Sequence, residues 1–203
     1  FMRAIEYKNN NFNITEPFQS LFTQGMVCHE TYKDENNNWL SPNEIERKGN
    51  TVVLKNNPTK KVKVGPSESM SKSKKNVIDP EFIINNYGAD SVRLFILSDS
   101  PPEKDVQWSD TGVASANKFL QKIWNLNNLI LNRKENISDK KIEKKFDMEV
   151  NNYLSKIDAS INSFRFNVSI AHFYEVYNFF KSYIDKKISN KLMKESIIKV
   201  LKL

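Results

Sequence analysis

A short run of lysines and hydroxyl groups, SESMSKSKKN at residues 67–76, has the residue types best suited to chemistry on phosphates. Lys72 carries a compact ammonium on a flexible stem, and Ser71 and Ser73 offer hydroxyls that can donate to phosphate oxygens. Met70 is the one apolar residue of this run, and we expect it to dock the loop on the edge of a pocket. A single lysine that faces a triphosphate in a partly shielded site accelerates the reaction by about 100- to 1000-fold.

A bare run of lysines and serines also has a simpler interpretation, as a solvated basic turn or a nucleic-acid-binding patch. The chain has a net charge of +7 and an isoelectric point near 9.3, which favours a polyanionic partner such as nucleic acid or phosphates. A coding bias toward A and T, which enriches lysine together with asparagine and isoleucine, would give the same charge. Charge alone therefore leaves both a catalytic loop and an RNA-binding patch open.

The elements before the loop, to about Val64, are predicted to be strand-rich. The apolar run SLFTQGMV, residues 20–27, predicts a buried strand. Residues 51–65, TVVLKNNPTKKVKVG, predict a hairpin that turns at residues 56–59. Residues 33–44 between them are predicted to be a polar loop. The basic loop is therefore anchored by a hairpin on one side.

The pattern after the loop changes to helix. Asp79 is a good N-cap, Pro80 suits the first helical position and Gly88 suits a left-handed C-cap. A second helix is predicted from about Asp90, and the two prolines at residues 101–102 end it. We place a candidate domain boundary there.

From Ser109 onward, apolar residues recur at helical spacing, which predicts three or four amphipathic helices in an antiparallel bundle. Residues 132–145 and 165–167 are the predicted breaks. Trp124 is predicted to lie in the core of this bundle, although a tryptophan can also stack on an RNA base. The charged link that contains Arg133 and Lys134 fits either a contact with RNA phosphates or a solvated turn.

Composition excludes several classes of protein. Hydrophobic residues make up 39% and aromatic residues 11%, enough for a folded core, and no apolar run approaches the length of a membrane span. The first residues show no signal peptide. Cys28 is the single cysteine, which excludes an internal disulfide and suits a reducing cytosol. His29 and His172 are interpreted as structural or surface residues, and Cys28 with His29 is a poor zinc site.

The order of residues around the loop resembles a known family. SMSKS at residues 69–73, followed by Asp79-Pro80, by YGAD at residues 87–90 and by Arg93, resembles the KMSKS region of class I aminoacyl-tRNA synthetases. The passage from SPP to Trp124 is similar to the bacterial-type leucyl-tRNA synthetases, where such a helix leads into the anticodon-binding bundle. The resemblance covers essentially the whole chain, and its specific part runs from Met70 to Trp124.

The resemblance implies a fold, a reaction and a set of partners. The fold is the α/β carboxyl half of a Rossmann-type catalytic domain with a small β-hairpin insertion, followed by an all-α antiparallel helix bundle. The expected domains are residues 1–103, with the insertion at about 32–65, and a helical anticodon-binding domain at 104–203. The full enzyme would be a cytoplasmic leucine–tRNA ligase, a monomer without membrane contact. Its partners are leucine, ATP with Mg²⁺, and tRNA(Leu).

The same resemblance assigns the site. Lys72 matches the second lysine of the KMSKS signature and is the expected catalytic residue, and Ser69, Met70, Ser71 and Ser73 complete the expected ATP site. Ser69 stands where the family has lysine, so one positive charge over the phosphates is absent. We expect either weakened activation or compensation by a neighbouring lysine such as Lys74.

The HIGH motif of this class does not occur in the sequence, and the two histidines lie too far apart to form it. We therefore expect the chain to be a segment of a longer enzyme that is inactive without its amino-terminal half. A valyl- or isoleucyl-tRNA synthetase is the alternative within the class. A non-catalytic basic helical RNA-binding module is the alternative outside it.

Overall fold

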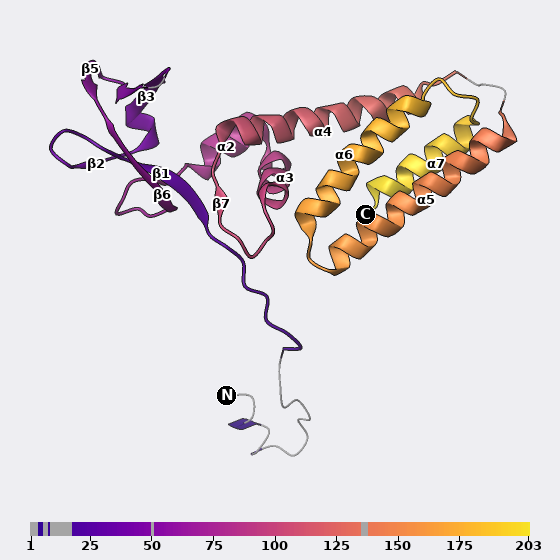
Figure 1. Cartoon of the computed structure of the whole chain (residues 1–203), viewed down its shortest axis with the longest axis horizontal. Coiled ribbons are helices and arrows are strands. Elements are labelled where there is room, and N and C mark those ends of the chain that lie inside the picture. Colours follow the sequence, from indigo (N-terminus) through magenta and orange to yellow (C-terminus); the bar gives the residue numbers. More distant parts are fainter. Residues whose placement is uncertain (1–3, 6–7, 9–17, 50, 135–137) are drawn as a thin grey trace.

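The computed structural model describes residues 4, 5, 8, 18–49, 51–134 and 138–203. The molecule is elongated, with its strands at one end and a group of long helices at the other (Figure 1). The long helix α4, Asp110–Leu131, joins the two parts. The basic loop belongs to the strand end, so the strands around it determine how the loop is supported.

Two small sheets form the strand region. In the first, β1, Val27–Lys33, pairs antiparallel with β2, Trp39–Leu40, and with β6, Lys63–Ser69, and parallel with β7, Val106–Gln107. In the second, β3, Ile45–Lys48, β4, Thr51–Leu54, and β5, Asn57–Lys61, pair in order. Their shared core consists of Tyr32, Leu40, Val52 and Val62.

The predicted strand at residues 20–27 is wrong for most of its length, because β1 begins only at Val27. The segment before it pairs with the loop after α3 instead: the Gly25 amide donates to the Pro102 carbonyl at 2.8 Å. A Cβ at Gly25 would lie 2.1 Å from the Lys104 carbonyl oxygen, so this close approach requires glycine. Phe18 and Leu21 are exposed here, since no sheet covers the segment.

The hairpin prediction is confirmed in part. Strands β4 and β5 pair as expected, but the turn lies at residues 55–56 and Val64 belongs to β6 of the other sheet. Residues 33–44 are not entirely loop. They contain β2 and a short 3-10 helix η1, Pro42–Glu44, whose start is capped by the Ser41 and Glu44 side chains.

Two short helices follow the loop as predicted. Helix α2, Pro80–Tyr87, begins after Asp79, whose carboxylate accepts from the Glu81 amide, and ends at Gly88 with φ of 81°. Helix α3, Ala89–Asp99, ends before the two prolines. Phe95 and Ile83 pack with Val106 and Val113 in the core between these helices and α4.

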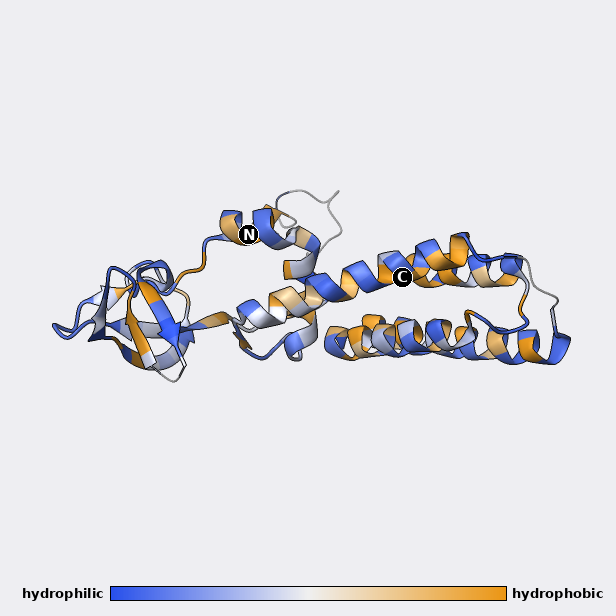
Figure 2. Ribbon diagram, turned by 90° about the horizontal axis from the view of Figure 1, so that it is seen from above, coloured by the Kyte–Doolittle hydropathy of each residue, from blue (hydrophilic) through white to orange (hydrophobic). Residues whose placement is uncertain are grey.

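The helical part contains α4, α5, Lys140–Asn162, α6, Phe166–Tyr183, and α7, Asn190–Leu201. Successive helices reverse direction (Figure 1). Hydrophobic residues of these helices alternate with polar ones along each ribbon in Figure 2, as the periodicity predicted. The fully buried core is Ile130, Phe146, Ile157, Phe180, Ile188 and Met193.

Trp124 corrects the prediction for this region, because its side chain is 68% exposed instead of buried. Its neighbours on the helix, Phe119 and Leu126, are the buried ones. Trp124 lies just outside the face of α4 that packs against the other helices. Apolar spacing predicts the position of such a face only to within about one residue. The breaks also shift slightly, since α5 begins at Lys140 and α6 begins at Phe166.

Candidate functional site

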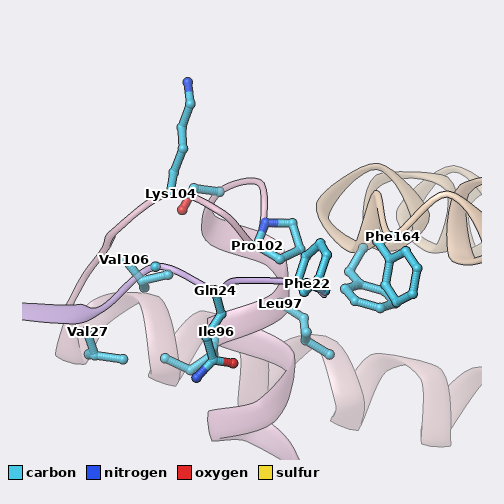
Figure 3. Close-up of a pocket in the computed structure, with 12 residues that line it drawn as sticks. Phe22, Gln24, Val27, Ile96, Leu97, Pro102, Lys104, Val106 and Phe164 are labelled. Atoms are coloured by element: carbon cyan, nitrogen blue, oxygen red, sulfur yellow. The ribbon is translucent and has the colours of Figure 1, made fainter. Parts of the chain in front are cut away.

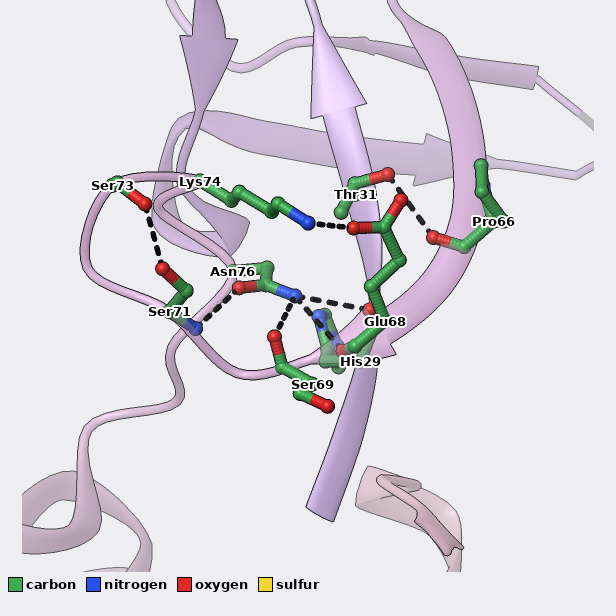
Figure 4. Close-up of polar contacts among 9 residues, drawn as sticks. All are labelled: His29, Thr31, Pro66, Glu68, Ser69, Ser71, Ser73, Lys74 and Asn76. Carbon is green, nitrogen blue, oxygen red and sulfur yellow. Dashed lines mark hydrogen bonds and ion pairs between the residues drawn. The ribbon is translucent and has the colours of Figure 1, made fainter. Parts of the chain in front are cut away.

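The basic loop leaves β6 at Ser69 and returns to α2 at Asp79, and the centre of its support is the buried side chain of Asn76 (Figure 4). The Asn76 amide nitrogen donates to the carbonyls of Glu68 at 3.1 Å and His29 at 3.2 Å, with Ser69 at 3.5 Å. Its oxygen accepts from the Ser71 amide at 2.8 Å. Only an amide with the nitrogen toward the carbonyls satisfies these partners. Asn76 therefore ties the start of the loop to two strands.

Some side chains of the loop face solvent, and another forms an ion pair with the sheet. Lys72 is exposed, and the hydroxyls of Ser71 and Ser73 lie 2.7 Å apart beside it. The Lys74 ammonium forms an ion pair with the Glu68 carboxylate on β6. While this pair holds, Lys74 does not replace the charge that Ser69 lacks.

The backbone of the loop makes a tight turn. The Lys75 amide donates to the Lys72 carbonyl at 3.2 Å, and Lys75 has a positive φ of 54°. This left-handed region costs a residue with a side chain about 1 kcal/mol relative to glycine. The turn runs from Lys72 to Lys75, and the Lys72 side chain at its start is exposed.

Met70 docks the loop as predicted. Its side chain lines an apolar cavity of about 280 Å³ whose other walls come from β1, α2, α3 and Trp108. The Met70 amide also donates to the Val27 carbonyl at 3.1 Å. Ser69 is exposed at the end of β6, opposite Cys28 in the ladder. The sequence-predicted residues 69–73 are therefore contiguous on the surface, with Met70 alone turned inward.

Two titratable groups lie behind the loop on β1. Burial lowers the pKa of His29, whose ring contacts the Glu30 carbonyl at 3.0 Å. Burial, with the hydrogen bond to Glu30, raises the pKa of Tyr32 to about 12. Both groups are therefore neutral near pH 7, and His29 is a structural residue here, as the sequence predicted.

A second cavity, of about 300 Å³, lies where the strand region meets the helices (Figure 3). Gln24 and Gly25, from the segment before β1, line it. Phe22 stacks on Phe164 at its end, with ring centroids 4.9 Å apart. Among the described residues that line it, most are apolar and Lys104 is the one cation, so we interpret this cavity as packing space between the two parts of the chain.

Other candidates have structural roles. Arg133 does not face solvent as a phosphate contact would: its guanidinium donates to the carbonyls of Ile184, at 2.5 Å, and Ile188, at 2.6 Å, and to that of Lys186. His172 pairs with Glu175 at 3.1 Å. In the part of the chain that the structure describes, no three His, Cys, Asp or Glu side chains gather as a metal site. No described helix is long and apolar enough to cross a membrane.

Comparisons with known proteins agree with the geometry of the loop region. The family model for tRNA synthetases class I (I, L, M and V) matches residues 62–109, which contain β6, the loop, α2, α3 and β7. The chain belongs to this class I tRNA synthetase family. Its relatives there are leucine–tRNA ligases, of which that of Orientia tsutsugamushi (strain Boryong) is 43% identical over 88% of this chain and 21% of its own length.

A second relative covers nearly all of the chain. Leucine–tRNA ligase of Ehrlichia chaffeensis is 41% identical over 97% of this chain and 23% of its own length. This chain therefore spans about a fifth of the relatives it matches. The crystal structure of an Agrobacterium radiobacter LeuRS–tRNA–LeuAMS ternary complex has the same fold over 97% of this chain and 22% of its own, with a TM-score of 0.68 at 20% identity.

Sequence reasoning missed the role of Asn76, which ends the run but was not singled out. The available signal was a short amide between a basic run and the apolar pair Val77-Ile78. Asparagine side chains often form hydrogen bonds with nearby backbone groups of a loop or turn.

Proposed function

We propose that residues 1–203 are the KMSKS-like part of a leucine–tRNA ligase, which activates leucine with ATP and transfers it to the 3′ end of tRNA(Leu). The observation that carries this proposal is Lys72, which is exposed on the loop directly after the backbone amide that Asn76 holds. The family and the leucine–tRNA ligase relatives support the choice of reaction. We also propose that Mg²⁺ binds together with ATP and that the full enzyme acts in the cytoplasm.

In the proposed reaction, a leucine carboxylate oxygen attacks the α-phosphorus of ATP, and the bond to the β-phosphate oxygen breaks. Leucyl-adenylate forms and pyrophosphate leaves with the electron pair of that bond. Negative charge grows on the leaving group, and the Lys72 ammonium lowers the barrier because it is held beside that charge. The Ser71 and Ser73 hydroxyls donate to the same phosphate oxygens. In a second step, a hydroxyl of the terminal ribose of the tRNA attacks the leucyl carbonyl carbon, the acyl–phosphate bond breaks and AMP leaves.

We propose a two-part organisation for the chain as well. The strand region with α2 and α3 is the carboxyl part of a Rossmann-type catalytic domain, and the helices from α4 onward are an anticodon-binding domain. Because β7 at residues 106–107 pairs with β1, we carry the boundary from residues 103/104 to Ser109, the N-cap of α4. The full enzyme is proposed to act as a monomer with its amino-terminal half.

The test is amino-acid-dependent exchange of labelled pyrophosphate into ATP. Residues 1–203 would replace the matching segment of the Ehrlichia chaffeensis ligase, which aligns over 97% of this chain. Exchange that requires leucine, and is not supported by valine or isoleucine, supports the proposal. A folded chimera that binds tRNA but exchanges nothing would favour the non-catalytic RNA-binding alternative.

Position 69 has its own test. Ser69 is exposed, so a lysine fits there without displacing the core. If the absent charge weakens activation, Ser69→Lys in the chimera should raise the rate of adenylate formation by about tenfold, a change of about 1.4 kcal/mol in the barrier. An unchanged rate would show that the loop does not need this charge.

A further inference from the structure

We propose that Asn76 is the positioning residue of the basic loop: its buried amide fixes the loop to the ends of β6 and β1, and so determines where the Lys72 ammonium stands. This inference rests on the proposed function for its consequence in catalysis, but its structural part is independent of it. Asn76 does not reach the surface, since its exposed fraction is 0%. It therefore acts on ATP only through the residues that it holds.

The first observation is the pair of positions that one side chain joins. Through its oxygen, Asn76 holds the amide of Ser71, the residue directly before Lys72. Through its nitrogen it holds the Glu68 carbonyl, near the end of β6. The five residues 71–75 therefore form a loop that is closed at both ends by one amide. The flexible length around Lys72 is short, which restricts the volume that the ammonium can sample.

The second observation is the link to β1. The Asn76 nitrogen also donates to the His29 carbonyl at 3.2 Å, across the sheet from β6. The base of the loop is thus hydrogen-bonded to β1, the central strand of the first sheet, as well as to β6, from which the loop leaves. A rigid strand is a better support for a catalytic group than a loop is.

The third observation is the cost of any replacement. A buried amide is tolerated only when its hydrogen-bonding groups are satisfied, and those of Asn76 are. Asn76→Ala leaves the Ser71 amide and two carbonyls without this partner. Asn76→Asp has the same shape but turns a carboxylate oxygen toward carbonyl oxygens, which repel it. Comparing the two variants separates the effect of losing side-chain volume from the effect of losing the hydrogen bonds, because Asn76→Asp keeps the volume.

The catalytic test is a double-mutant cycle in the chimera, with kcat and KM for ATP measured in leucine-dependent exchange. We expect Asn76→Ala and Asn76→Asp each to lower kcat by about 100-fold per folded molecule, because a misplaced group costs about that much. In a Lys72→Ala background the same changes should cost less than about 3-fold, since the group being positioned is gone. Equal losses in both backgrounds would overturn the proposal.

Asn117→Ala is the matched control. Asn117 is a half-buried asparagine whose nitrogen also donates to protein acceptors, the Tyr87 carbonyl at 2.9 Å and the Ser91 hydroxyl at 3.1 Å, but it joins α4 to α2 and α3. Its loss should lower the thermal stability and leave kcat per folded molecule unchanged. A loss of kcat equal to that of Asn76→Ala would mean that any lost amide has this effect, and would contradict a positioning role.

A second measurement needs neither catalysis nor a variant that folds. In the 203-residue chain, amide hydrogen exchange at Ser71 should be at least about tenfold slower than at Ser73, because Ser71 donates to Asn76. Equal exchange at the two amides would overturn the anchoring itself. If the chimera shows no exchange of pyrophosphate while Ser71 is protected, the proposed function fails and the anchoring of the loop stands.

Discussion

The helical bundle and the strand region around the basic loop are stabilised by different kinds of contact. In the bundle, large apolar side chains such as Phe146 and Phe180 are completely buried; Phe146 stacks on Phe179 and meets Phe180 edge to face. In the strand region the loop is held by the amide of Asn76 and by the Lys74–Glu68 ion pair. Apolar packing in the bundle therefore contributes most of the stability, whereas hydrogen bonds and an ion pair fix the position of the loop. The two regions should respond to different mutations.

The largest expected effect on stability lies in the bundle. Phe146→Ala should lower the free energy of unfolding by about 3–5 kcal/mol, because it removes a fully buried ring and leaves a cavity. Met148→Ala is the control, since Met148 lies on the exposed side of the same helix and should change stability by less than about 0.5 kcal/mol. Urea denaturation measures both, and equal effects would contradict the assignment of this core.

The hydrogen bonds of the Arg133 guanidinium at the end of the bundle should have the next largest effect on stability. Arg133→Lys should lower the free energy of unfolding by about 2–3 kcal/mol, because a lysine does not reproduce the donors that hold the carbonyls of Ile184 and Ile188. Lys134→Ala, one residue on and exposed, should be neutral. If RNA affinity changed at Arg133 while stability did not, the solvent-facing interpretation of this residue would be restored.

The turn of the loop gives a smaller effect of opposite sign. Lys75→Gly should stabilise the chain by up to about 1 kcal/mol, because Lys75 has a φ of 54° and glycine adopts it freely. Lys74→Gly should not stabilise it, since it removes the ion pair with Glu68. Thermal denaturation of the two variants decides, and destabilisation by Lys75→Gly would show that the left-handed turn is not formed in solution.

The smallest effect is a dependence of stability on pH. The pKa of His29 is lowered by burial from 6.5 in the folded state, so the unfolded chain binds the proton more readily. Stability from this group is complete above pH 6.5 and is lost as the pH falls below it. Glu30, Arg47 and Asp110 face the ring and act on the same titration. His29→Gln should reduce the slope of the unfolding free energy with pH there, and an unchanged slope would assign it to other groups.

The parts that the sequence predicted share a simple physical signal. Helices α4 to α7 follow from apolar spacing, and the start and end of α2 follow from Asp79 and Gly88, because periodicity and caps are local. The exposed Trp124 and the true start of β1 at Val27 did not follow, since each depends on which distant segment packs there.

The candidate site divides in the same way. Lys72 and Met70 were predicted from residue type and order; in the structure the Lys72 side chain is exposed and Met70 lines an apolar cavity. Asn76 was not found, because its partners on β1 and β6 lie up to 47 positions away in the chain. A hydrogen bond across a sheet depends on strand register, which no local pattern records.

The central claim, that the loop supplies chemistry through Lys72 and not through its charge in general, is tested by one measurement. Lys72→Ala and Lys75→Ala each remove one exposed lysine from the same loop, and both would be assayed for leucine-dependent pyrophosphate exchange in the chimera. We predict a loss of about 100-fold or more for Lys72→Ala and little change for Lys75→Ala, with both proteins equally stable. Equal losses, or none in either, would contradict the account and leave the loop as a basic patch.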